Sequence, residues 1–304
     1  MKRFKSILCI IEPEKRSQAA VIQSVRIASE HQADLTFASV FGADQSWRRR
    51  PFFRKRLAED LNEITQKKRS EIESWLFNFM PSKEISAEIY SGIGFIEIIK
   101  SVINNHHDLV IKCAEDNDWI DRLLGSEDMH LIRKCPCPVL ILKPGQIDNF
   151  RNILATVDVN DDSSESEQGC VQDKLNMEVL EYSAALCLPE LIELHVGSVW
   201  EPYAEDFFRY GAFTSLSEDK VDSYVEQIRR ECADKLDALL RDFGNRLGEG
   251  AAQYLLPRRH LVKGSPAREI PLIADKYDID LIVMGTVGRT GIPGLFIGNT
   301  AESI

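Results

Sequence analysis

Short apolar runs alternate with longer amphipathic stretches along the whole chain, and this alternation predicts a regular series of strands and helices. The runs Leu109-Val110-Ile111 and Leu281-Ile282-Val283 have no polar side, which is typical of strands in a parallel sheet covered by helices on both faces. In the first half we expect strands at 5–11, 35–41, 86–91, 108–112 and 138–143, and helices at 16–31, 57–79, 94–106 and 127–134. In the second half we expect strands at 151–157, 190–196, 258–263 and 280–284, and helices at 171–187, 218–246 and 266–277.

The two halves repeat one another. Residues 87–112 align without a gap with residues 259–284, so that Gly92 falls on Gly264 and Asp108 on Asp280. Such a repeat predicts two copies of one domain, at 1–145 and 150–304. With right-handed crossovers, each copy becomes a doubly wound, five-stranded parallel sheet of the Rossmann-like kind. Because Ile304 aligns with Leu131, we expect the second copy to be truncated and to lack its last strand.

A candidate anion site follows the strand at 280–284. Gly285 and Gly288 come directly after it, and nine residues later Gly298-Asn299-Thr300 opens a predicted helix. Glycines allow positive φ and close approach to the backbone, and helix N-termini attract anions. Asp158, which ends the first strand of this copy, should face the same crevice. The competing interpretation is that these glycines serve ordinary tight turns.

Charge and composition narrow the functional classes. The net charge of −11 argues against general nucleic-acid binding. The basic cluster Arg48–Arg56 surrounds two phenylalanines and is either a solvated loop or the place for an anionic ligand. There is no run of about 18 apolar residues, so no transmembrane segment is expected, and the default location is the cytoplasm. The seven scattered cysteines read as reduced thiols, with Cys135 and Cys137 interpreted as structural and no metal site expected.

Catalysis is not the favoured interpretation. The chain has no G-x-x-x-x-G-K-[ST] motif, no H-E-x-x-H motif and no recognisable base to orient a water molecule. Arg289 lies beside the glycine turn, where it either stabilises phosphate charge or is simply solvated. No catalytic residue is therefore assigned.

The segment Met284-Gly285-Thr286-Val287-Gly288-Arg289, continued by Gly298-Asn299-Thr300, resembles the G-x2-G-x9-G-[ST] nucleotide signature of the universal stress protein family. The two-copy arrangement is similar to the tandem E-type members, and the resemblance covers nearly the whole chain. It implies an adenine nucleotide alpha hydrolase-like fold and a stress-response regulator that binds ATP or a related adenine nucleotide, with or without Mg2+. It also implies an intramolecular pseudo-dimer or a homo-oligomer.

The resemblance further implies a role for each matching residue of the second copy. Asp158 would bind the ribose or adenine region, while Val196 and Met284 would contact the base. The phosphate side would be formed by Gly285, Gly288, Arg289, Gly298, Asn299 and Thr300. Asn299 stands where the signature prefers serine or threonine, which keeps a donor but changes its reach.

The first copy departs from the signature. Cys113 and Asp116 replace the two glycines, and Asp116 would repel phosphate, so no nucleotide is expected in the ordinary position there. Lys112 either pairs with Asp116 or Asp118 or favours another anionic ligand. Two alternatives to a nucleotide-binding regulator remain at this point: a scaffold whose pockets serve packing or partner docking, and a slow ATPase.

Overall fold

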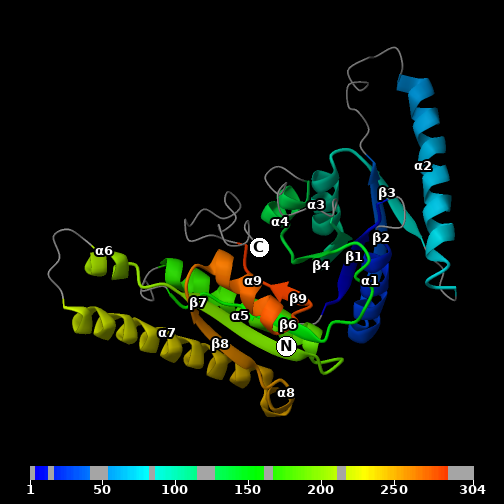
Figure 1. The fold of residues 1–304 in the computed structure, drawn as a ribbon. Helices are drawn as coiled ribbons and strands as arrows, with labels where there is room; N and C mark the ends of the chain where they lie inside the picture. Colours follow the sequence, from blue (N-terminus) through cyan, green and yellow to red (C-terminus); the bar gives the residue numbers. More distant parts are fainter. Residues whose placement is uncertain are drawn as a thin grey trace. The chain divides into compact units, whose positions relative to one another are not determined.

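The structure, a computed structural model, describes residues 4–12, 17–41, 54–81, 86–114, 127–160, 167–210 and 217–286, with side chains omitted at 54–61 and 167–170. The chain divides into two compact units between Asn149 and Phe150. Each unit is an α/β structure in which helices connect the strands of one parallel sheet (Figure 1). The predicted fold class is confirmed.

The first unit contains a five-stranded sheet of order β3-β2-β1-β4-β5. Every neighbouring pair of strands is parallel. The strands are β1 (Ser6–Ile10), β2 (Asp34–Phe41), β3 (Ala87–Ser91), β4 (Leu109–Cys113) and β5 (Val139–Leu142). The helices are α1 (Gln18–His31), α2 (Arg54–Leu76), α3 (Gly94–Asn105) and α4 (Glu127–Lys134).

Alternation along β1 divides the core of the first unit between the two faces of the sheet. Leu8 and Ile10 pack in one cluster with Ile98 of α3 and Leu131 of α4. Cys9 points the other way and contacts Ser24 of α1. The strands read as unbroken apolar runs because both of their faces are buried in this way.

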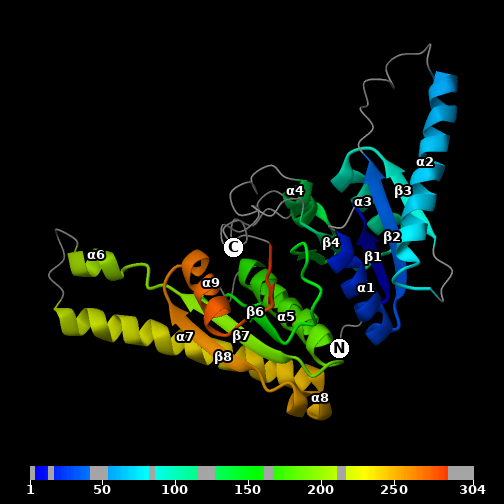
Figure 2. The ribbon, with the colours of Figure 1, turned by 45° about the vertical axis from the view of Figure 1, so that its right-hand side comes forward.

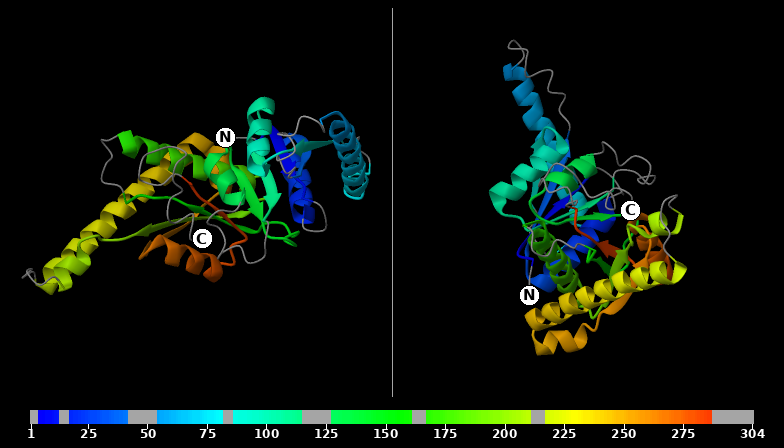
Figure 3. Two further views of the ribbon diagram at one scale, coloured as in Figure 1. Left: turned by 90° about the horizontal axis from the view of Figure 1, so that it is seen from above. Right: turned by 90° about the vertical axis from the view of Figure 1, so that its left-hand side faces the viewer.

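The second unit contains a four-stranded parallel sheet of order β8-β7-β6-β9. Its strands are β6 (Asn152–Thr156), β7 (Glu193–Trp200), β8 (Arg258–Lys263) and β9 (Leu281–Val283). Its helices are α5 (Glu167–Cys187), α6 (Glu205–Tyr210), α7 (Glu218–Leu247), α8 (Glu249–Tyr254) and α9 (Pro266–Lys276). Helices α5 and α7 cover one face of the sheet and α9 covers the other (Figures 2 and 3).

The elements of the second unit differ from the prediction in two places. Strand β7 begins later and runs further than the expected 190–196, because a turn with Leu191 at φ 55° separates it from α5. The short helices α6 and α8 were not predicted, since six residues are too few to show a helical period. Among the described residues this sheet has no counterpart of β5, as expected, and β9 is therefore its edge strand.

Two glycines show that the sequence repeat is also a structural repeat. Gly92 has φ 156° and Gly264 has φ 144°, and each lies between a strand and the next helix. The N–H group of Gly92 donates to Phe41 O in the neighbouring strand β2 (3.3 Å), and that of Gly264 donates to Trp200 O in the neighbouring strand β7 (3.0 Å). Only glycine adopts these angles without strain, so the aligned positions carry the same turn.

The aligned aspartates perform the same task in both units. Asp108 accepts hydrogen bonds from the backbone N–H groups of Lys5 (2.8 Å) and Ser6 (3.1 Å) at the start of β1. Asp280 accepts from Arg151 (2.7 Å) and Asn152 (2.9 Å) at the start of β6. In each unit the carboxylate therefore fixes the amino end of the first strand against the fourth.

Candidate functional site

The candidate site lies where β6 and β9 end side by side. The two strands pair in parallel with Ala155 opposite Val283, and the hydroxyl of Thr156 donates to the carbonyl of Val283 (3.4 Å). From β6 the chain proceeds through α5 to β7 on one side, whereas β9 lies on the other side. This is the reversal of strand order at which open parallel sheets bind ligands. Asp158 and Gly285 follow these two strand ends.

Helix α5 holds the backbone of Asp158 through one buried amide. The side chain of Asn176, which is 4% exposed, accepts from Asp158 N (3.0 Å) and donates to Asp158 O (2.7 Å). Gln172 Nε2 donates in turn to Asn176 Oδ1 (3.1 Å). The residue after the strand is thus fixed by a side chain 18 positions away, and the sequence pattern offers no signal for this role.

The carboxylate of Asp158 is oriented by the following loop. Its Oδ1 accepts from the backbone N–H of Asn160 (3.0 Å), which forms the local turn typical of aspartate. Asn160 Nδ2 donates to the carbonyl of Val199 in β7 (2.6 Å). The loop after β6 is therefore tied to the neighbouring strand and presents an acidic group at the edge of the sheet.

Gly285 permits a close approach to the backbone. Its φ is not among the positive values of the described glycines, so the position does not use the left-handed conformation that glycine allows. A Cβ added here would lie 2.5 Å from Cδ2 of Leu175 in α5. The absence of a side chain at Gly285 thus lets α5 pack against the end of β9.

The other predicted residues fall at different depths. Met284 is half-buried and lies beside Gly285 at the strand end, whereas Val196 is fully buried within β7, opposite Ala155 of β6. The structure therefore brings Asp158, Met284 and Gly285 to one edge and places Val196 in the sheet interior behind it. The remaining predicted residues lie outside the described part of the chain: Gly288, Arg289, Gly298, Asn299 and Thr300.

A groove of about 640 Å3 adjoins Asp158 between α5 and α7. Both of its walls carry charges, and Arg246 of α7 contacts Glu181 (3.7 Å) and Asp242 (3.2 Å). Opposite charges thus already pair within the groove. Apart from Asp158, its lining residues were not predicted, because the groove forms only when two separate helices lie together.

At the corresponding edge of the first unit, charged side chains pair with one another. By alignment Glu12 stands for Asp158 and Lys112 for Met284. Lys112 Nζ lies 2.9 Å from Glu12 Oε1 and 2.6 Å from Asp128 Oδ1, and its side chain is only 4% exposed. Burial alone would lower the pKa of Lys112, but the two carboxylates outweigh burial and hold this pKa above its usual value.

This ion cluster bears on one of the sequence expectations. Lys112 was expected either to pair with Asp116 or Asp118 or to attract an anionic ligand. Asp116 and Asp118 lie outside the described residues, and among the described residues Lys112 pairs with Glu12 and Asp128. Its charge is thus already balanced inside the unit, which leaves little attraction for an external anion.

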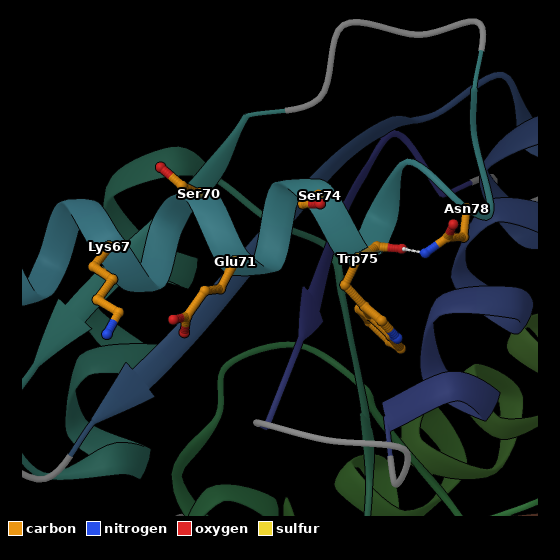
Figure 4. Close-up of a pocket in the computed structure, with 6 residues that line it drawn as sticks. All are labelled: Lys67, Ser70, Glu71, Ser74, Trp75 and Asn78. Atoms are coloured by element: carbon orange, nitrogen blue, oxygen red, sulfur yellow. Dashed lines mark hydrogen bonds between the residues drawn. The ribbon is translucent and has the colours of Figure 1, made fainter.

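A second hollow, of about 630 Å3, follows the outer face of α2 (Figure 4). Every residue that lines it belongs to this one stretch: Lys67, Ser70, Glu71, Ser74, Trp75 and Asn78. Figure 4 shows Lys67 and Glu71 side by side on the helix, with Asn78 Nδ2 donating to the carbonyl of Trp75 (3.0 Å). Because its described lining residues all come from one stretch, they bring no groups of separate elements together, and we do not take this hollow as the candidate site.

The part of the chain that the structure describes contains no cluster of three or more side chains able to hold a metal ion. None of its helices combines the length and the apolar composition needed to cross a membrane. The basic cluster Arg48–Arg56 lies largely outside the described residues, and its side chains are not among those described.

Comparisons with known proteins agree with this architecture. A sequence model described as "Universal stress protein family" matches residues 3–143 and again residues 149–304. The universal stress protein E homolog of Haemophilus influenzae is 28% identical over 311 residues, covering 99% of this chain and 94% of its own length. Universal stress protein E of Escherichia coli K12 is 30% identical over 211 residues, covering 69% of this chain and 61% of its own length.

A solved structure extends the likeness to the fold. The crystal structure of a universal stress protein from Archaeoglobus fulgidus superposes with a TM-score of 0.57 at 17% identity. The match covers 99% of this chain and 93% of that protein. Given the family match over both units and the repeated parallel sheets, this chain belongs to the universal stress protein family.

Proposed function

We propose that this protein is a stress-response regulator that binds an adenine nucleotide, ATP or a close relative, at the carboxyl edge of its second sheet. The observation that carries the proposal is the contrast between the two edges. The second presents Asp158, Met284 and Gly285 together, whereas the first closes the aligned position with the ion cluster of Lys112. One nucleotide per chain is the expected stoichiometry.

The residues at the second edge fit the nucleoside part of such a ligand. The carboxylate of Asp158 is an acceptor for ribose hydroxyl groups, and its position is set by the fixed backbone and the Asn160 turn. Met284 offers a half-buried apolar side chain for a base. Val196 supports this surface from inside the sheet and is not assigned a direct contact with the base.

The phosphate side of the proposed site belongs to the segment after Gly285. We assign the phosphates to the backbone at Gly288 and to the predicted helix start at Gly298, with Asn299 and Thr300 as additional donors. Arg289 supplies positive charge beside them. The proposed role is binding and regulation, because no described residue near Asp158 is placed as a general base for a water molecule.

The decisive experiment is titration calorimetry of the full chain with ATP, with and without Mg2+. Replacing Asp158 by alanine removes one hydrogen bond to a charged acceptor, so affinity should fall roughly tenfold to a hundredfold. The matched control is Glu12→Gln at the aligned position of the first unit, which should leave affinity unchanged because Glu12 faces Lys112. Absence of ATP binding by the unaltered chain, or equal losses in both variants, would refute the proposal.

A second measurement separates the regulator from a pure scaffold. Replacing Gly288 by tryptophan should abolish ATP binding through steric exclusion while the circular dichroism spectrum stays the same. If a cellular stress phenotype then persists unchanged, the protein acts as a scaffold and bound nucleotide is incidental. Any ATP hydrolysis that survives Gly298→Val would come from a contaminating enzyme.

A further inference from the structure

Two cysteines meet at the junction between α4 and β5 of the first unit, whereas the proposed nucleotide site belongs to the second unit. Cys135 follows the last residue of α4, Cys137 precedes β5, and their Sγ atoms are 3.6 Å apart. Both side chains are half-buried. The junction lies at the amino end of β5, whereas ligands of a parallel sheet gather at the carboxyl ends of its strands.

The backbone keeps these two thiols together. Each cysteine precedes a proline, Pro136 or Pro138, and a residue before proline is restricted to extended conformations. On one side Cys135 N donates to Leu131 O (2.8 Å), which joins the junction to the end of α4. On the other side Val110 N donates to Pro138 O (3.0 Å), which joins it to β4. The pair is therefore held between two anchored elements.

The two thiols differ in acidity. A hydrogen bond from Cys137 lowers the pKa of Cys135 in spite of its partial burial, whereas the same interaction raises the pKa of Cys137. One proton is thus shared by the pair, with Cys135 as the preferred thiolate. By contrast, burial raises the pKa of Cys9 and of Cys187 to about 12, which keeps these two thiols protonated and unreactive.

We infer that Cys135 and Cys137 form a redox-active dithiol that is oxidised to an intramolecular disulfide by low-molecular-weight disulfides of the glutathione class. The geometry carries the inference, because two thiols already in contact need to close only from 3.6 Å to the bonded distance of about 2.05 Å. Neither residue contributes to the proposed nucleotide site.

The reaction balances as two successive exchanges. The Cys135 thiolate attacks one sulfur of the small disulfide, the S–S bond breaks, and one small thiolate leaves. Cys137 Sγ then attacks Cys135 Sγ, releases its proton to a departing thiolate, and displaces the second small thiol. The protein loses two electrons and one proton, and the small disulfide is reduced to one thiol and one thiolate.

The test uses the full chain equilibrated in buffers of graded reduced and oxidised glutathione, followed by alkylation under denaturing conditions and trypsin digestion. Cleavage after Lys134 and Arg151 releases one peptide that contains both thiols and no other cysteine. This peptide should lose two hydrogens as the buffer becomes oxidising, while the peptides of Cys9 and Cys187 stay alkylated. A dithiol peptide that persists at equilibrium even in oxidised glutathione without added reduced glutathione would overturn the inference.

Two single variants test whether the pair acts as a unit. Cys137→Ser should stop at a mixed disulfide on Cys135, because the resolving thiol is missing. Cys135→Ser should likewise stop at a mixed disulfide, on Cys137. Loss of two hydrogens in either variant, or a disulfide between two chains of the unaltered protein in place of the internal one, would contradict the inference. Circular dichroism verifies that both variants are folded.

Discussion

The carboxyl edges of the two sheets belong to the same repeat, but they carry different side chains with different partners. In the second unit Asp158 and Met284 follow β6 and β9, and the acidic group is oriented by its own loop. In the first unit the aligned residues are Glu12 and Lys112, and Lys112 forms ion pairs with both Glu12 and Asp128. A duplicated fold can thus keep its strand order while the carboxyl edge of one sheet is occupied by an internal ion cluster. The difference depends on very few side chains.

The structural positions of the repeat did not diverge in the same way. Gly92 and Gly264 keep the same turn, and Asp108 and Asp280 keep the same bonds to the start of the first strand. Replacing either glycine would strain the backbone, and replacing either aspartate would remove the hydrogen bonds that hold the start of the first strand. At the carboxyl edges the two copies are held by different contacts: the ion cluster of Lys112 in the first unit, and the packing of Leu175 against Gly285 in the second.

The largest expected effect comes from Lys112→Met, which gives the first unit the residue of the second. The change leaves Glu12 and Asp128 without their shared cation, and breaking a buried pair of this kind costs about 3 to 5 kcal/mol. Urea unfolding, with hydrogen exchange of the β4 amides as the local readout, measures the loss. Adding Asp128→Asn should restore part of the stability by removing one buried charge. Full stability in the single variant would show that the cluster is not important for the fold.

A smaller effect is expected from Asn176→Leu in the second unit. The variant removes both hydrogen bonds to the backbone of Asp158, and unsatisfied buried groups cost about 1 to 3 kcal/mol. ATP affinity should fall together with stability, because the position of Asp158 is no longer fixed. Gln172→Ala is the matched control, since Gln172 donates to the side chain of Asn176 and leaves both bonds from Asn176 to the backbone of Asp158 in place. Unchanged affinity in Asn176→Leu would separate this amide from the proposed site.

The smallest effect concerns the response of the two units to acid. In the second unit His195 Nδ1 and His260 Nε2 are 2.9 Å apart, and Tyr277 packs beside both rings. Burial lowers the pKa of His195, and burial followed by the nearby charges of His195, Lys276 and Arg258 lowers that of His260. In the first unit burial lowers the pKa of His107 in the same direction.

The sign of this effect follows from proton uptake. Below the ordinary histidine pKa of about 6.5, these histidines bind protons in the unfolded chain but stay neutral in the folded units. The free energy of unfolding therefore falls as pH falls. The second unit should lose more than the first, because it contains two such histidines. Thermal unfolding at several values between about pH 7.5 and pH 5 checks this order, and His260→Phe should flatten the dependence of the second unit. Equal pH dependence of both units would contradict it.

Much of the fold was predictable from the residues alone because short-range patterns control it. Unbroken apolar runs such as Leu109-Val110-Ile111 identify buried parallel strands, and the constant spacing between Gly92 and Gly264 identifies the repeat. The candidate edge was also predictable, since Asp158 and Gly285 follow strands that topology makes neighbours. The short helix α6 was not, because six residues carry too little pattern.

The sequence by itself determined the two-fold repeat, the order of strands and helices, and the family to which the chain belongs. Only the tertiary structure decided which partner each buried polar group takes. Asn176 reaches Asp158, Lys112 reaches Glu12 and Leu175 reaches Gly285 across distances in sequence that no local pattern covers. Periodicity records which face of an element is buried, whereas a hydrogen bond or an ion pair depends on the three-dimensional meeting of two particular side chains.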